Sequence, residues 1–210
     1  MITSTSSSQV KHVVNLQKKA KLRKEEKQFV VEGVKMVSEA PADRLVKVYV
    51  SETFKADNEE FLERMNYDSI GKDVLEIVTD NVFMRMADTQ TPQGIMAVVR
   101  MSDTDLEGIL SDKRNPLLLI IENLQDPGNL GTIVRMAEGA GVTGIIMSSN
   151  TVDIYNPKTI RSTMGSLYRV PVIYVDDICE AADVCKSKGV TVYALSLIHI
   201  SEPTRRRGIS

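Results

Sequence analysis

From residue 117 onward the chain alternates short apolar runs with amphipathic segments, and this alternation is the feature that most restricts its fold. The apolar runs predict strands over 117–121, 144–147, 170–175 and 190–195, and the segments between them predict helices over 129–140, 158–165 and 178–188. Buried strands that alternate with helices predict a parallel sheet covered on both faces. Because such sheets bind ligands at the carboxyl ends of their strands, we look for chemistry in the loops after Ile121, Met147, Val175 and Leu195.

Residues 9–100 predict a separate, small mixed α/β domain. Here the pattern predicts helices over 10–27, 34–40, 58–65 and 81–87 and strands over 46–50, 75–78 and 94–99. The composition changes at residues 101–114, ahead of Pro116, as is typical of an interdomain linker. We therefore expect a domain at 9–100, a linker at 101–114 and a second α/β domain at 115–196.

Residues 197–210 differ from the rest of the chain. They have no helical period and end in a basic cluster at 205–207. This composition resembles read-through or fusion sequence more than the continuation of a domain. We therefore expect a non-native tail and give its arginines no functional weight.

Charge and composition restrict the kinds of partner. The formal net charge is −2, which argues against a protein that is basic all over, so any binding to nucleic acid must come from local patches. Aromatic residues make up 5% of the chain and Trp is absent, so base stacking on an aromatic platform is not the expected binding mode.

The cysteines and the apolar runs indicate the compartment. Cys179 and Cys185 lie six residues apart in a helical pattern, which predicts reduced thiols, and no metal-binding spacing is present. No apolar run approaches the length of a membrane span, and the first residues lack a signal-peptide layout. We expect a soluble protein of the cytoplasm that binds no metal.

The segment from Glu122 to Arg135 carries the strongest chemical signal. It follows a buried strand, turns through Asp-Pro-Gly and opens a helix at Asn129, a favoured N-cap residue. Arg135 stands among apolar neighbours, where an unpaired buried guanidinium would be costly. Two alternatives follow: Arg135 pairs with Glu138 one turn away, or it is directed at a phosphate, which a guanidinium binds through two parallel hydrogen bonds.

This segment resembles the first motif of the SpoU/TrmH family. The resemblance consists of the acidic residue after a strand, the run Gln-Asp-Pro-Gly-Asn-Leu-Gly over 125–131, and an Arg six residues past the Asn. The stretch 157–165, Pro-Lys-x-x-Arg-x-x-x-Gly, is similar to a second family segment, and it is followed by Val-Pro-Val at 170–172. Residues 29–33 and 91–97 resemble the family's substrate-binding domain. The resemblance covers roughly residues 9–195.

The resemblance implies both an activity and an architecture. Members are RNA ribose 2′-O-methyltransferases of the SPOUT class, so it implies methyl transfer from S-adenosylmethionine to a ribose 2′-hydroxyl of rRNA or tRNA. It also implies an N-terminal RNA-binding domain of the ribosomal-protein type and a homodimer. By analogy Arg135 is the catalytic arginine that engages the phosphate of the target nucleotide. Asn129 would order the loop and the RNA backbone, or simply cap the helix; Glu122 would orient Arg135, or be an ordinary loop residue.

The basic residues are candidates for contact with the RNA backbone. Residues 11–27 carry a net charge of +5. Such a run is commonly a solvated helix face, but its concentration in a slightly acidic protein favours phosphate contacts, which position RNA without reading sequence. On one face of a later helix, Lys158 and Arg161 are further candidates, with simple surface exposure as the alternative. The candidates in the first run are Lys18, Lys19, Lys21, Arg23 and Lys24.

The family pattern breaks off near Leu195. Members continue with a glycine-rich turn that carries an acidic residue and with a Ser-Leu-Asn stretch, whose loops form the trefoil knot that holds the methyl donor. Neither motif follows Leu195, so Ala194 and Leu195 would line only the first wall of that pocket. We expect the knot to be incomplete or missing, with weak donor binding and little or no activity. The alternative is a non-catalytic RNA-binding protein of the same fold. A small-molecule enzyme would need a phosphate-binding glycine loop, which residues 128–131 imitate only weakly.

Overall fold

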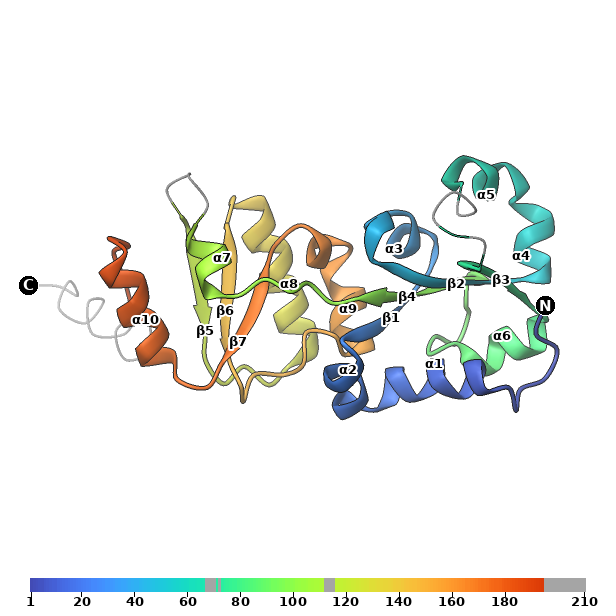
Figure 1. Ribbon diagram of the computed structural model, residues 1–210, viewed down its shortest axis with the longest axis horizontal. Helices are drawn as coiled ribbons and strands as arrows, with labels where there is room; N and C mark the ends of the chain where they lie inside the picture. Colours follow the sequence, from blue (N-terminus) through green and yellow to red (C-terminus); the bar gives the residue numbers. More distant parts are fainter. Residues whose placement is uncertain (67–70, 72, 112–115, 195–210) are drawn as a thin grey trace, which may run out of the picture.

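The computed structural model of the protein describes residues 1–66, 71, 73–111 and 116–194. Two sheets follow one another along an elongated molecule (Figure 1). The first sheet has the strand order β1-β4-β2-β3, in which β4 is antiparallel to both of its neighbours and β3 is parallel to β2. Its strands are β1 (Gln28–Glu32), β2 (Leu45–Ser51), β3 (Leu75–Val78) and β4 (Ile95–Arg100).

Helices pack on the first sheet in the way that its alternating pattern requires. The face that carries Val30, Met96 and Val98 is covered by α1 and α6, whose buried side chains form one cluster with it. The other face packs against α3 and α4. These helices are α1 (Ser8–Lys18), α2 (Ala20–Glu26), α3 (Val34–Ser38), α4 (Glu52–Asp57), α5 (Glu59–Met65) and α6 (Asp80–Met86), with a 3₁₀ turn at Ala42–Arg44.

Two features of this half differ from the sequence prediction. The single helix expected over 10–27 is two helices, because Lys19 adopts an extended conformation with φ −115° and ψ 102° and ends α1 before α2 begins. The helix α4 was not predicted. It begins after Ser51, whose hydroxyl accepts a hydrogen bond from the Phe54 N–H and so caps the first turn.

The second sheet is parallel throughout and has the order β5-β6-β7, which confirms the predicted α/β class. All five residues of the central strand β6 are buried. Ile145 and Met147 belong to the same apolar cluster as residues of α8 and α9, whereas Ile146 faces α7 and α10. The elements are β5 (Leu118–Ile121), α8 (Pro127–Gly139), β6 (Gly144–Ser148), α9 (Pro157–Thr163), a 3₁₀ turn at Ser166–Tyr168, β7 (Val172–Val175) and α10 (Ile178–Ser187).

The segment predicted as a linker, 101–114, contains a short helix, α7 (Leu106–Leu110). Asp105 caps this helix by accepting a hydrogen bond from the Gly108 N–H. Ile109 is 3% exposed and packs with Ile146 and Ile173 of the second sheet. This part of the segment therefore belongs structurally to the second domain.

The predicted strand 190–195 is wrong for the residues that the structure describes. Residues 190–194 have no strand conformation and pair with no strand. Val190 instead donates its N–H to the Cys185 carbonyl at the end of α10, and both Val190 and Val192 pack beside the α7–α10 cluster. Apolar alternation alone does not make a strand without a ladder partner. Leu195, the tail 197–210 and any knot lie outside the described residues, so those expectations stay predictions.

One apolar core runs from the first sheet into the second. Phe29 of β1 packs on Tyr155 with ring centroids 4.7 Å apart, and the Tyr168 hydroxyl donates to the Met36 carbonyl at 2.9 Å. The largest apolar cluster contains residues of both halves. The two domains therefore meet through a packed interface. Within the described part of the chain, no helix is long and apolar enough to cross a bilayer.

Candidate functional site

Two loops at the carboxyl ends of β5 and β6 are hydrogen-bonded to each other. Asn123, in the left-handed conformation with φ 54°, donates its N–H to the Ser148 hydroxyl at 3.0 Å, and that hydroxyl lies 3.0 Å from the Thr151 hydroxyl. Gln125 donates from its side-chain amide to the Asn150 carbonyl at 2.7 Å. These bonds fix the loop that leads into α8.

The helix α8 begins two residues earlier than predicted, and its N-cap is Asp126. The Asp126 carboxylate accepts the Asn129 N–H at 2.6 Å, and Pro127 occupies the first turn, where it lacks only an N–H that would have no helical partner. The prediction that Asn129 is the N-cap is therefore wrong. Its side chain is exposed and has no hydrogen bond within the described residues, so its amide is available to a ligand.

Arg135 is exposed and forms no hydrogen bond or ion pair within the described ranges. The intrahelical pair with Glu138, one of the two alternatives, is absent. Glu138 is bound instead by Arg169, which also pairs with Glu39 at 2.7 Å. The hydrogen bonds from Arg169 and Ser166 hold the pKa of the Glu138 carboxyl below its usual range. The guanidinium of Arg135 thus faces solvent.

One face of α8 presents an exposed stripe that is polar except for one methionine. Asn129, Thr132, Arg135 and Met136 follow helical spacing and are all exposed, Met136 by 68%. The opposite face is buried. There a Cβ atom on Gly131 would lie 2.3 Å from the Ser162 Cβ of α9. Gly131 therefore allows α8 and α9 to approach closely, and it lies on the face of α8 opposite the exposed stripe.

Glu122 directly follows β5 and is exposed. Among the residues that the structure describes it forms no ion pair with Arg135, so the orienting contact that we expected is not present. Its proposed role in the reaction stays a prediction.

The basic run on α1 and α2 contains one residue that cannot contact RNA. Lys18, Lys19, Lys21 and Lys24 are exposed, as expected, but Arg23 is only 3% exposed. The prediction of an RNA contact for Arg23 is therefore wrong, and the physical reason is that all three nitrogens of its buried guanidinium already donate to protein acceptors.

The partners of Arg23 come from both halves of the molecule. Its Nε and Nη2 atoms donate to the Asp153 carboxylate of the second domain at 3.0 and 2.5 Å. Its Nη1 atom donates to the carbonyls of Leu16 and Gln17 at 2.6 and 2.9 Å. The sequence of α2 contains a signal for this buried arginine. The helix has seven residues, of which only Ala20 and Leu22 are apolar, so few other side chains could pack it against the rest of the protein.

The two candidates on α9 differ from one another. Lys158 is exposed in the first turn, where Asn156 caps the helix. Arg161 is 41% exposed and pairs with Asp88 of the first domain at 2.6 Å. The Nη1 atom of Arg161 is therefore used in an ion pair between the two domains.

The described residues do not account for a site for S-adenosylmethionine. Ala194 is exposed, and Leu195 lies outside the described residues. Among the described residues, no group of three or more His, Cys, Asp or Glu side chains is placed to hold a metal ion.

Comparison with known proteins finds a match for each half of the chain. Residues 116–206 match the SpoU rRNA Methylase family, and residues 7–97 match the MRM3-like substrate binding domain. The chain is 32% identical to human mitochondrial rRNA methyltransferase 3 over 170 residues, which are 77% of this chain and 38% of that protein. It is 35% identical to the 23S rRNA (guanosine(2553)-2′-O)-methyltransferase of Bacillus subtilis over 127 residues, which are 58% of this chain and 46% of the relative.

The fold is also found among solved structures. The AdoMet-bound rRNA methyltransferase from Sinorhizobium meliloti superposes with a TM-score of 0.71 at 25% identity, and the match covers 87% of this chain and 67% of that one. The chain spans less than half the length of the two curated relatives above.

Proposed function

Because the chain belongs to the SpoU family of RNA methyltransferases, we propose that it acts on ribosomal RNA as part of an enzyme that methylates a ribose 2′-hydroxyl. The observation that carries this proposal is the guanidinium of Arg135, on the helix that follows β5, which is exposed and has no partner among the residues that the structure describes. Ribosomal RNA is proposed as the substrate because both curated relatives above are named as rRNA methyltransferases.

In this proposal Arg135 binds and orients the RNA. A guanidinium stays protonated in proteins, so it is a poor base, but it binds a phosphate through two parallel hydrogen bonds. Holding the phosphate of the target nucleotide would fix the neighbouring 2′-hydroxyl and stabilise the charge that develops on its oxygen. The proton of the hydroxyl passes to phosphate or solvent.

Asn129 and the lysines complete the RNA-facing surface. The side-chain amide of Asn129 is free because Asp126 caps the helix, so it can bind the RNA backbone. S-adenosylmethionine supplies the methyl group in this reaction, and the described residues assign no contact to it. The exposed lysines on α1 and α2, together with Lys158, would bind phosphates further along the RNA.

The test measures RNA binding and methyl transfer separately. Wild type and Arg135→Ala are each titrated with fluorescent ribosomal RNA fragments and incubated with radiolabelled S-adenosylmethionine. We expect wild type to bind RNA, and any transfer, however slow, to depend on Arg135. Failure to bind RNA would overturn the proposal, and transfer that is unchanged in Arg135→Ala would remove Arg135 from it.

A second candidate function is a non-catalytic RNA-binding protein of the same fold. It is favoured by the exposure of Ala194, the residue expected to line the donor pocket. RNA binding by the 210-residue chain with no methyl transfer at any donor concentration supports this candidate, whereas Arg135-dependent transfer excludes it.

We also propose a homodimer in the cytoplasm. Two observations support the dimer: Met136, beside Arg135, is 68% exposed, and Leu117, before β5, is 51% exposed. The free cysteines Cys179 and Cys185 are consistent with a reducing compartment. Light scattering during size-exclusion chromatography tests the first proposal, and fractionation of the source cells tests the second.

A further inference from the structure

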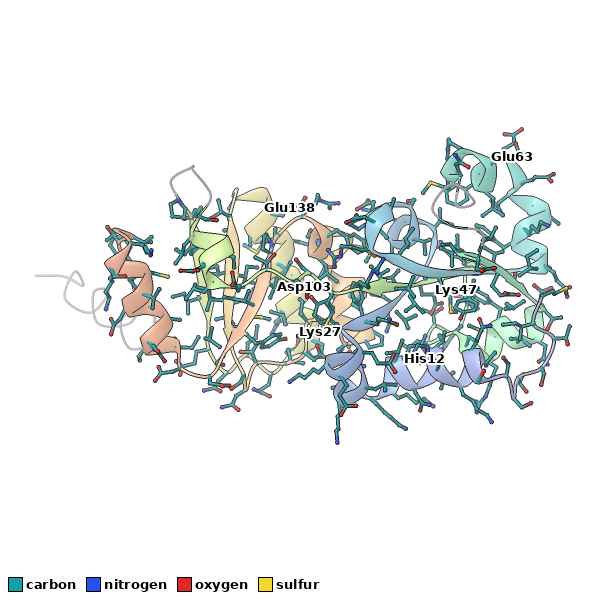
Figure 2. The ribbon with its side chains drawn as sticks, viewed as in Figure 1. His12, Lys27, Lys47, Glu63, Asp103 and Glu138 are labelled. Carbon is teal, nitrogen blue, oxygen red and sulfur yellow. The ribbon has the colours of Figure 1, made fainter. Side chains whose placement is uncertain are left out.

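A cavity of about 450 Å³ lies between α2, the segment 101–106 and the strand β7, where the two domains meet. Sites for small ligands have volumes of this size. Its wall is formed by the strand residues Val172 to Val175, by Tyr155 and Tyr174, and by Lys24 and Lys27 at the end of α2. Figure 2 shows Lys27 and Asp103 at this junction between the halves. Of the residues proposed above to bind RNA, only Lys24 lines it; Arg135 and Asn129 do not.

The charges in this cavity favour an anion. Two carboxylates line it, but the Asp153 charge is compensated by Arg23, and the Asp105 carboxylate accepts the Gly108 N–H at 2.7 Å. Lys24 and Lys27 form no ion pair within the described residues; the Lys24 ammonium lies 6.0 Å from the centre of the Tyr174 ring. Among the described residues, two cations without an ion pair thus face one carboxylate whose charge is not compensated.

The aromatic wall is held in a fixed position. The Tyr174 hydroxyl donates to the Val152 carbonyl at 2.9 Å and accepts the Ile154 N–H at 2.8 Å. Burial raises the pKa of Tyr155 to about 12, so that this phenol stays neutral. The Tyr174 ring with the Lys24 ammonium over it, and Lys27 in the same lining, match a nucleotide, since the cations can bind its phosphate and the ring can stack on its base. This single stacking contact differs from the binding mode that the low aromatic content led us to expect.

The wall formed by α2 is held by Arg23, while Leu22 packs against the apolar cluster on the first sheet. Arg23 is the only buried residue of α2, and its bonds to Asp153 and to two carbonyls of α1 fix the helix against the second domain. The backbone that carries Lys24 and Lys27 is therefore placed beside the cavity before any ligand arrives.

We propose that this cavity binds one nucleotide of a single-stranded RNA segment, with its phosphate at Lys24 and Lys27 and its base against Tyr174. An RNA chain, and not a free nucleotide, is the occupant because exposed lysines continue the basic surface along the same two helices, at Lys18, Lys19 and Lys21. The inference rests on the proposed function, since it assigns part of the same RNA substrate to a second site.

The first experiment removes the cations. Wild type and the double variant Lys24→Ala/Lys27→Ala are titrated with a fluorescein-labelled single-stranded RNA of about 12 nucleotides, and Lys55→Ala/Lys188→Ala is the matched control, because both control lysines are exposed and lie outside the lining of the cavity. We expect weaker binding at low salt and a plot of log Kd against log salt whose slope falls by about 0.7, for the one phosphate that the variant no longer binds. The control variant should leave the RNA affinity and the salt dependence unchanged.

The second experiment isolates the ring. Tyr174→Phe and Tyr174→Leu both lose the hydroxyl that anchors the neighbouring loop, so their difference reports the ring alone. We expect the Leu variant to bind RNA at least about fivefold more weakly than the Phe variant, with similar melting temperatures. RNA containing 4-thiouridine should form photo-crosslinks that map to the peptide with Tyr174.

The outcomes separate this inference from the proposed function. If wild type binds RNA in an Arg135-dependent way and the lysine and tyrosine variants bind like wild type, the cavity proposal is overturned while the function stands. If wild type binds no RNA, the proposed function fails and the inference fails with it. Displacement of RNA by a nucleoside monophosphate at equal concentration would show that the cavity takes a free nucleotide, and would overturn RNA as its occupant.

Discussion

The helices α2 and α8 each carry one functionally informative arginine, and the two arginines occupy opposite environments. In α2 the arginine stands in a lysine-rich run, and it is the one residue of that helix that is buried. In α8 the arginine stands among apolar residues, yet it is exposed, while Leu130, Val134 and Ala137 fill the buried face. Neighbours in sequence therefore do not decide the burial of a charge. Helical phase and the available partners decide it.

The largest expected effect comes from breaking the buried arginine of α2. The variant Arg23→Met leaves the Asp153 carboxylate, only 18% exposed, without its cation, and it leaves two backbone carbonyls without donors. We expect the free energy of unfolding to fall by about 3 kcal/mol, near the lower end for a buried pair because Asp153 retains some solvent. Urea denaturation measures the change.

The partner variant sharpens this result. The double variant Arg23→Met/Asp153→Asn removes both charges, so it should cost less than the sum of the two single variants. A decrease below about 0.5 kcal/mol for Arg23→Met would mean that this arginine behaves as a surface residue, and it would remove the contrast between the helices.

The second prediction concerns the buried face of α8. In Gly131→Ala the new methyl group would collide with Ser162 of α9, so we expect the protein to be destabilised by about 1–3 kcal/mol. The matched control is Gly139→Ala in the same helix, where no atom lies within 4 Å of the added Cβ. That control should stabilise the protein by up to about 1 kcal/mol through helix propensity. Thermal unfolding followed by circular dichroism distinguishes the two, and equal effects would contradict the close helix contact.

The third prediction separates the cap of α8 from its exposed stripe. Asp126→Ala removes the side chain that accepts the Asn129 N–H and should cost about 1 kcal/mol in unfolding free energy. Asn129→Ala removes an exposed amide that has no partner within the described residues and should change stability by less than about 0.5 kcal/mol. If urea denaturation showed Asn129→Ala to be more destabilising than Asp126→Ala, Asn129 and not Asp126 would be the cap.

The smallest effect on stability is expected for the exposed arginine of α8. Because Arg135 has no partner within the described residues, Arg135→Ala should change the free energy of unfolding by less than about 0.5 kcal/mol. Its RNA affinity should nevertheless fall by about tenfold, as expected when a charged group no longer hydrogen-bonds to its ligand. A destabilised variant with unchanged RNA affinity would reverse the assignment of Arg135.

The local sequence pattern was sufficient to predict an element where the residues of one segment alone determine its structure. The strand 75–78 was predicted with the bounds that the structure has, and the two later strands 117–121 and 144–147 differ by one residue at an end. It was insufficient where the outcome depends on a distant partner. Residues 106–110 form a helix that packs on Ile146. Residues 190–194 have no neighbouring strand within the described ranges. Neither outcome can be predicted from local periodicity.

The candidate site divides in the same way. The motif at 125–131 and the arginine six residues past Asn129 were sufficient to indicate the family and to single out Arg135, which the structure shows to be exposed. The cap at Asp126 was missed because Asn129 is equally suited to that position by composition. Arg23 was assigned to the solvent-facing run because its partner Asp153 lies 130 residues away.

By itself the sequence determined the α/β class and the family, because apolar periodicity and a short motif are properties of contiguous residues. Only the tertiary structure decided which arginine is buried, that Gly131 serves a helix contact, and that Lys24, Lys27 and Tyr174 share one cavity. The physical reason is that a charge or a small residue acquires its role from the groups packed against it, and the fold brings those groups together from segments that are far apart in the chain.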